Sequence, residues 1–120
     1  VYICPGGKHL RLEKNRSGLL AATVSDEPRE ALYKPSANVL MESAGLTLGR
    51  RALGVTLTGM GNDGLEGTKV LKQKGGWAIA QSEGTCVVYG MPKAIVDAGF
   101  ADEVVDLDDM ASTIMGHFVK

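Results

Sequence analysis

The sequence predicts an α/β fold with a doubly wound, largely parallel sheet. Two continuous apolar runs, ALGVTLT at 52–58 and WAIAQ at 77–81, are separated by a segment long enough for one helix. This is the spacing of a βαβ unit, in which a crossover helix joins two parallel strands. Short glycine turns and further helical segments continue the alternation. We expect the first run to be a central strand that is covered on both faces.

The amino-terminal part predicts a strand and a hairpin. Residues 1–4 are strand-like and end at the Pro-Gly-Gly of 5–7. Residues 10–13 and 19–24 flank the turn-rich KNRSG and predict a hairpin outside the main sheet. Because the chain starts without Met and directly on a strand-like run, we expect it to be a fragment whose sheet lacks amino-terminal strands.

Four helices and one short strand complete the expected fold. Ser36 can cap a helix over 37–48, with Leu40 and Ala44 on its buried face and Gly49 after its end. The remaining elements follow in chain order: helices at 65–74 and 91–98, a strand at EVVDL (103–107), and a last helix capped by Asp108 or Asp109. In that helix, Met110, Ile114 and Phe118 recur every four residues.

Composition excludes several functional classes. The net charge of -1 and the aromatic fraction of 5% give no basis for a nucleic-acid partner. No apolar run approaches the roughly 18 residues of a membrane helix, and no signal peptide is visible, so we expect a cytoplasmic protein without membrane insertion. Cys4 and Cys86 lack metal-ligand spacing. We expect them to be buried free thiols, and we expect neither a metal nor an organic cofactor.

The stretch LTGMGNDG at 57–64 places an acid, Asp63, among glycines just after an apolar strand. In open α/β sheets, functional groups gather beyond the carboxyl ends of the strands. Backbone N–H groups ahead of a helix can also hold an anion or a developing oxyanion. We expect a site around Asp63. Four residues are expected to shape the loop: Gly59, Gly61, Asn62 and Gly64.

Two roles for Asp63 stay open. The spacing Asp63-x-x-Glu66 fits a capping box at the start of the following helix. One carboxylate oxygen can instead orient a histidine, as the acid of a Ser-His-Asp triad does. The loop also contains G-x-G-x-x-G, with Glu83 about 20 residues further on, so a phosphate- or nucleotide-binding module is an alternative.

A triad also needs a nucleophile and a base, and the chain offers no obvious pair. The elbow G-x-S-x-G does not occur in the sequence. His9 follows the first predicted strand, where we expect it to support the site or the structure without taking part directly. His117 is expected on the solvated side of the last helix. By itself the chain carries an acid without a nucleophile or a general base.

Several segments together resemble a known family. VYICPGGKHL, KPSANVLMES, GVTLTGMGNDG, AIAQSEGTCVVYGMPKAI and ADEVVDL follow the order and spacing of the catalytic domain of chemotaxis protein-glutamate methylesterases of the CheB type. The resemblance covers residues 1–120, as the carboxyl-terminal portion of one such domain. Lys34 and Asn38 stand where the family usually has Arg and Asp, which we expect to alter helix anchoring or receptor contact.

The resemblance implies hydrolysis of glutamyl methyl esters, and also glutamine deamidation, on bacterial chemoreceptors by a Ser-His-Asp mechanism. It implies that Asp63 is the acid of the triad and that the Met60 backbone N–H helps form the oxyanion hole. The serine and histidine of the family lie upstream of the matched portion, so we expect this chain alone to be inactive. A non-catalytic chemotaxis interaction domain is a further alternative.

The implied partners are the methylated cytoplasmic domains of chemoreceptors and an amino-terminal receiver domain in the full-length protein. Self-association of the fragment is also expected, because a sheet that lacks strands exposes an edge that can pair with another chain.

Overall fold

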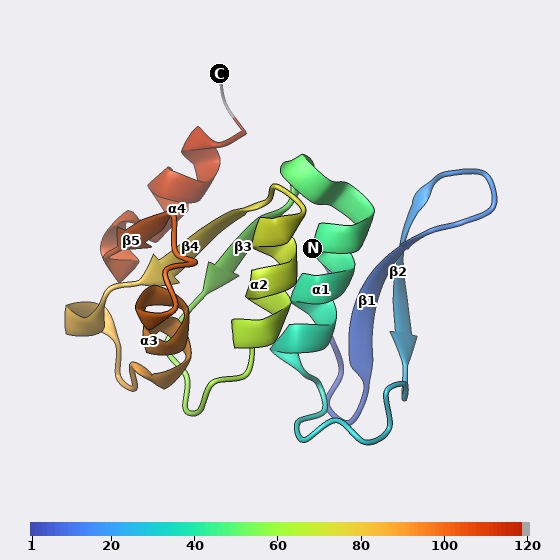
Figure 1. Cartoon of the computed structure of the whole chain (residues 1–120), viewed down its shortest axis with the longest axis horizontal. Coiled ribbons are helices and arrows are strands. Elements are labelled where there is room, and N and C mark those ends of the chain that lie inside the picture. Colours follow the sequence, from blue (N-terminus) through green and yellow to red (C-terminus); the bar gives the residue numbers. More distant parts are fainter. Residues whose placement is uncertain (119–120) are drawn as a thin grey trace.

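The computed structural model describes residues 1–118 and has two sheets that flank a pair of helices (Figure 1). The elements in chain order are β1 (His9–Lys14), β2 (Leu20–Ser25), α1 (Ala37–Leu48), β3 (Leu53–Thr56), α2 (Leu65–Gln73), β4 (Trp77–Gln81), α3 (Gly90–Asp97), β5 (Glu103–Val105) and α4 (Leu107–Gly116). Single 3₁₀ turns lie at Gly49–Arg51 and Glu83–Thr85. The hairpin β1–β2 packs beside α1, and α1 packs beside α2.

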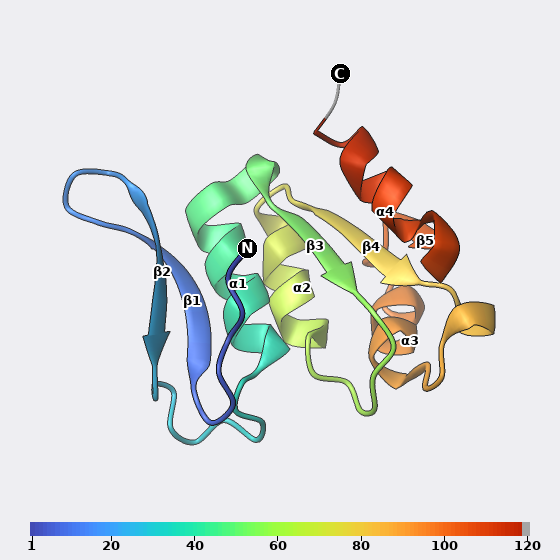
Figure 2. The same cartoon turned by 180° about the vertical axis from the view of Figure 1, so that it is seen from behind.

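The main sheet is parallel, as the two apolar runs predicted. Its order is β3–β4–β5, with Leu53 opposite Trp77 and Ile79 opposite Glu103. Helix α2 is the crossover between β3 and β4, and it lies behind these strands in Figure 2. The chain is therefore a mixed α/β fold with an antiparallel hairpin. Strand β1 is one residue longer than predicted at each end, and β2 begins and ends one residue later than predicted.

Strand β4 is the more deeply buried of the two predicted strands. Ala78, Ile79 and Ala80 are almost fully buried, whereas Leu53 and Val55 of β3 are half-buried. Among residues 1–118, one edge of β3 has no strand partner.

Helices α1 and α2 approach each other closely because both carry a glycine at the contact. A Cβ atom added to Gly45 would lie 2.7 Å from Leu71 Cα, and one added to Gly67 would lie 2.6 Å from Asn38 O. Both separations are far below an ordinary carbon contact. The two glycines thus allow backbone-to-backbone packing, and this packing fixes the amino-terminal ends of the two helices side by side.

Two local predictions are wrong. Residues 1–4 form no strand: Val1, Tyr2 and Ile3 are exposed, and no neighbouring strand among the described residues hydrogen-bonds to them. An apolar, β-branched run forms a strand only when a partner offers its backbone groups. Helix α4 begins earlier than expected, with Asp106 as its cap residue in place of Asp108 or Asp109.

The side chains of the last helix and the cysteines fit their predictions only in part. Met110 is buried, but Phe118 is 68% exposed. Both thiols are free, yet Cys4 and Cys86 are half-buried, not buried. Within residues 1–118, none of the helices combines the length and apolar character needed to cross a bilayer.

Candidate functional site

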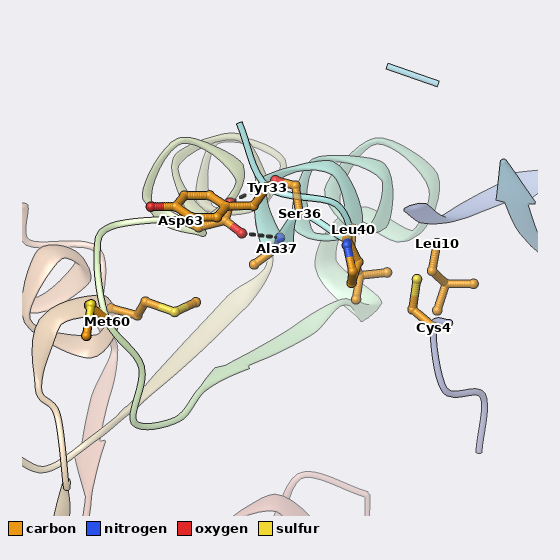
Figure 3. Close-up of a pocket in the computed structure, with 10 residues that line it drawn as sticks. Cys4, Leu10, Tyr33, Ser36, Ala37, Leu40, Met60 and Asp63 are labelled. Atoms are coloured by element: carbon orange, nitrogen blue, oxygen red, sulfur yellow. Dashed lines mark hydrogen bonds between the residues drawn. The ribbon is translucent and has the colours of Figure 1, made fainter. Parts of the chain in front are cut away.

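The carboxylate of Asp63 lies at the amino-terminal end of α1, a helix that precedes it in the sequence (Figure 3). Its Oδ1 accepts hydrogen bonds from Ser36 Oγ at 2.8 Å and from Asn38 N at 3.1 Å. Its Oδ2 accepts one from Ala37 N at 2.7 Å. Three donors therefore fix this side chain, and its carboxylate faces the positive end of the α1 dipole.

The capping box predicted for Asp63 and Glu66 does not form. The residue before α2 is Gly64, with φ 101°, and Glu66 is exposed. The first turn of α2 is capped by Asn38 instead, whose Oδ1 accepts from Gly64 N at 2.9 Å and from Gly67 N at 2.8 Å. The two helices thus cap each other: Asp63 serves α1, and Asn38 serves α2.

Ser36, His9 and Asp63 lie together, but their connectivity is not that of a catalytic triad. The Ser36 hydroxyl donates to Asp63, whereas a nucleophilic serine donates to histidine. His9 is fully buried, and its Nδ1 accepts from Ser36 N at 3.2 Å. Its Nε2 therefore carries the proton and donates to Pro28 O at 3.0 Å. With both nitrogens occupied, His9 holds the turn before α1 and is not free to act as a base.

The loop that carries Met60 is tied to the segment before α3. Gly59 N donates to Val88 O at 3.0 Å, and Met91 N donates to Gly59 O at 2.9 Å. Thr58 Oγ1 donates to Val88 O and accepts from Val88 N, both at 2.8 Å. These four bonds join the two most distinctive motifs of the sequence, TGMGNDG and VVYGMP.

Gly90 is required where these two motifs meet. A Cβ atom at this position would lie 2.9 Å from Gly61 O and 3.0 Å from Gly59 O. Met60 itself is 80% exposed, and its N–H has no hydrogen-bond acceptor among residues 1–118. The Met60 N–H is therefore one of the loop's backbone donors without an acceptor among the described residues, and the contacts with residues 88–91 hold the backbone beside it.

The glycines of the loop have distinct local roles. Gly61 and Gly64 adopt φ of 87° and 101°, a region that other residues rarely occupy. Gly59 has no positive φ, but a side chain there would clash with Met91 Sδ. Asn62 closes the turn, because its carbonyl accepts from Leu65 N at 3.2 Å.

A pocket of about 420 Å³ opens between α1 and the loop (Figure 3). It is mostly apolar, and Asp63 is the ionisable carboxylate that reaches it. The lining residues are Cys4, Leu10, Tyr33, Pro35, Ser36, Ala37, Leu40, Met60, Asp63 and Met91. An ion surrounded largely by apolar groups interacts more strongly with a partner charge than the same ion in water does.

The geometry disfavours the nucleotide-binding alternative. Phosphate binding at a helix start requires free backbone N–H groups. Asn38 already occupies those of Gly64 and Gly67, and Glu83 lies exposed in a separate 3₁₀ turn. Within residues 1–118 the structure also has no group of three His, Cys, Asp or Glu side chains that could hold a metal ion.

Sequence reasoning missed the roles of Asn38 and Gly90, and it gave Ser36 a different one. Ser36 is the cap residue of α1 by position, but its hydroxyl makes no capping bond and serves Asp63. Asn38 was singled out only as a departure from the family pattern; its place in the first turn of α1, where a short polar side chain can reach neighbouring N–H groups, was a further signal. No local pattern indicated that the N–H groups bonded by Asn38 are those of Gly64 and Gly67, at the start of α2.

His117 lies away from the pocket, at the other end of the sheet, with Trp77 and Glu103. Glu103 Oε2 accepts hydrogen bonds from His117 Nε2 at 3.0 Å and from Trp77 Nε1 at 2.8 Å. These bonds, the one from His117 first, hold the pKa of the Glu103 carboxyl below its ordinary value. His117 is exposed, as predicted.

Comparison with known proteins agrees with this fold. The sequence model of a family described as CheB methylesterase matches residues 1–114. The chain is 73% identical over 120 residues to "Protein-glutamate methylesterase/protein-glutamine glutaminase 1" of Oleidesulfovibrio alaskensis, covering all of this chain and 32% of that protein. It is 61% identical to the corresponding protein of Lawsonia intracellularis, again covering all of this chain and 33% of that protein.

A solved structure is also similar. The crystal structure of the Thermotoga maritima CheB methylesterase catalytic domain superposes with a TM-score of 0.89 and 31% sequence identity. The match covers 96% of this chain and 60% of that one. The chain thus spans about a third of the length of the curated relatives. By the family match and these identities, the chain belongs to the CheB methylesterase family.

Proposed function

We propose that this chain supplies two groups to a protein-glutamate methylesterase: the Asp63 carboxylate and the Met60 backbone N–H. The observation that carries the proposal is the pocket that both residues line, with Asp63 fixed by three donors. The names of the relatives supply the reaction class, hydrolysis of a glutamyl methyl ester or of a glutamine amide. The proposed substrates are methylated cytoplasmic domains of chemoreceptors.

In the proposed reaction Asp63 acts through a histidine from another segment of the complete domain. The carboxylate accepts the imidazole Nδ1–H and stabilises the imidazolium that forms when Nε2 takes a proton from a serine. The serine oxygen attacks the ester carbonyl, and Met60 N–H donates to the resulting oxyanion. The C–O bond to methoxide breaks, and the imidazolium returns the proton, which releases methanol. Water then hydrolyses the acyl-serine by the same route.

Both further groups must come from elsewhere because the candidates in this chain are occupied. His9 is buried with both nitrogens bonded, and the Ser36 hydroxyl donates to Asp63. We therefore expect no methanol release by the 120-residue chain alone. In the full-length protein we propose an amino-terminal receiver domain as the regulatory partner.

A chimera tests the proposal. The matching 120 residues of the Oleidesulfovibrio alaskensis relative are replaced by this chain, and methanol release from methylated chemoreceptor membranes is measured. We expect the chimera to be active and Asp63→Asn to lower kcat by at least about a hundredfold; the equivalent change in a serine protease costs about ten-thousandfold. Asp108→Asn, an exposed position on α4 away from the pocket, is the matched control.

Folding must be monitored in each variant, because an asparagine amide at position 63 would leave one donor of α1 facing another donor. Full activity in a folded Asp63→Asn chimera would reduce Asp63 to a helix cap and overturn the proposal. An inactive wild-type chimera beside an active relative would favour a non-catalytic interaction domain.

A further inference from the structure

We infer that Ser36 is a positioning residue for Asp63 and that Oδ2 of Asp63 is the oxygen that receives the histidine; this inference rests on the function proposed above. Each carboxylate oxygen offers two in-plane acceptor positions. Ser36 Oγ and Asn38 N fill both positions on Oδ1, whereas Oδ2 has the single donor Ala37 N. One acceptor position therefore remains, on Oδ2.

The Ser36 hydroxyl is committed to this task by its surroundings. Its backbone N–H donates to the buried His9, and His9 is itself anchored on Pro28 O. Both the backbone and the side chain of Ser36 are therefore held by hydrogen bonds. A serine that only capped α1 would use its oxygen to accept from the helix, and this hydroxyl makes no such bond.

The hydroxyl acts on the reaction through the electron density of the carboxylate. A charge-assisted donor on Oδ1 weakens Asp63 as an acceptor and fixes the plane of its carboxylate. Without that donor, Asp63 would hold an imidazolium more tightly, and the base would stay protonated to higher pH. The carboxylate would also turn more freely about its last torsion, so fewer molecules would present Oδ2 to the histidine.

The test uses Ser36→Ala and Ser36→Thr in the chimera described above. For Ser36→Ala we expect kcat to fall about tenfold with KM unchanged, as for the loss of one hydrogen bond to a charged group. We also expect the acid limb of the kcat/KM profile to move to higher pH. Ser36→Thr keeps the hydroxyl and an acceptable cap residue, so it should restore both kcat and the profile.

Ser43→Ala is the matched control on the same helix. The Ser43 hydroxyl accepts from Leu12 N at 2.9 Å and donates to Leu40 O at 2.8 Å, and it does not contact Asp63. Its loss should lower the melting temperature without moving the pH profile. A Ser36→Ala profile that coincides with that of Ser43→Ala would overturn the inference, as would a rise in KM with kcat unchanged.

The two proposals fail in different ways. If Asp63→Asn abolishes turnover and Ser36→Ala does not change it, the positioning role is wrong and the role of Asp63 stands. If Asp63→Asn is fully active, the proposed function itself is wrong, whatever Ser36 does.

Discussion

Asp63, which precedes α2, caps α1, and Asn38, which lies in α1, caps α2. Asp63 Oδ1 accepts from Asn38 N at 3.1 Å, and Asn38 Oδ1 accepts from Gly64 N, next to Asp63, at 2.9 Å. The arrangement couples the position of the proposed triad acid to a side chain 25 residues away in sequence. It also means that the stability of α2 depends on a residue of α1.

Replacement of Asn38 by alanine is expected to lower the free energy of unfolding by about 1–2 kcal/mol, the usual cost of losing a helix cap. Two N–H groups of α2 lose their acceptor in this variant. Asn38→Asp keeps an acceptor oxygen at the start of α2, so it should cost less. Urea unfolding of the 120-residue chain measures both.

Glu66→Ala is the control for this comparison. Glu66 is exposed and makes no capping bond, so only its favourable charge near the start of α2 is lost. We expect a change below about 0.5 kcal/mol. Equal losses for Asn38→Ala and Glu66→Ala would contradict the reciprocal caps.

Gly67→Ala is expected to destabilise the chain although alanine is the better helix former. The new methyl group would lie 2.6 Å from Asn38 O and 2.8 Å from Asn38 Cα, and these backbone atoms cannot rotate away. Overpacking of this kind costs about 1–3 kcal/mol, more than the roughly 1 kcal/mol gained in propensity. In Gly116→Ala the added Cβ meets no atom within 4 Å, so that change should be neutral or stabilising. Thermal unfolding of both variants tests this prediction. A stabilised Gly67→Ala would show that α1 and α2 are further apart than the structure places them.

Thr68→Val is expected to leave stability unchanged or to raise it by about 1 kcal/mol. The Thr68 hydroxyl is buried and has no hydrogen-bond partner among residues 1–118, so it carries a desolvation cost that valine removes at equal size. Thr47→Val is the contrast, because Thr47 Oγ1 donates to Leu12 O at 2.9 Å. It should lose about 1 kcal/mol. Differential scanning calorimetry compares the two variants. If Thr68→Val were less stable than Thr47→Val, this prediction would be wrong.

Glu103→Gln should remove part of the acid sensitivity of the chain. Hydrogen bonds from His117 and Trp77 hold the pKa of Glu103 in the folded state below its ordinary value of 4.5. A group with a lowered folded pKa stabilises the fold above its unfolded pKa, and this contribution is lost as pH falls through the folded pKa. Wild type should therefore lose stability below about pH 4.5 more steeply than Glu103→Gln. Parallel curves of melting temperature against pH would contradict the assignment.

The local elements were predictable because their signals are local. The runs at β3 and β4, the glycines after α1 and α2, and the polar turn of the hairpin each fix their own segment. Strand position was not predictable in the same way. Residues 1–4 have strand composition but pair with no strand among the described residues. Such outcomes depend on neighbours that are distant in sequence.

The same distinction between local and long-range features applies to the candidate site. Asp63 was predicted from its place after a strand and from the family resemblance, Met60 from the resemblance alone, and their roles remain proposals. The predicted capping box was wrong because Asp63 turns toward a helix 26 residues upstream in sequence. Capping rules describe the competition between neighbouring groups. They give no information on the backbone close packing at Gly45 and Gly67, which brings the start of α1 to this carboxylate.

The four hydrogen bonds between the Met60 loop and the segment 88–91 have a consequence for timescales. They exist before any substrate binds, so the backbone around Met60 should show nuclear magnetic resonance order parameters near 0.85, those of a rigid backbone. A donor held in this way requires no loop closure on the microsecond-to-millisecond scale before the chemical step. Turnover in the complete enzyme would then be free of a gating motion at this loop, and any slow conformational step would arise elsewhere in the protein.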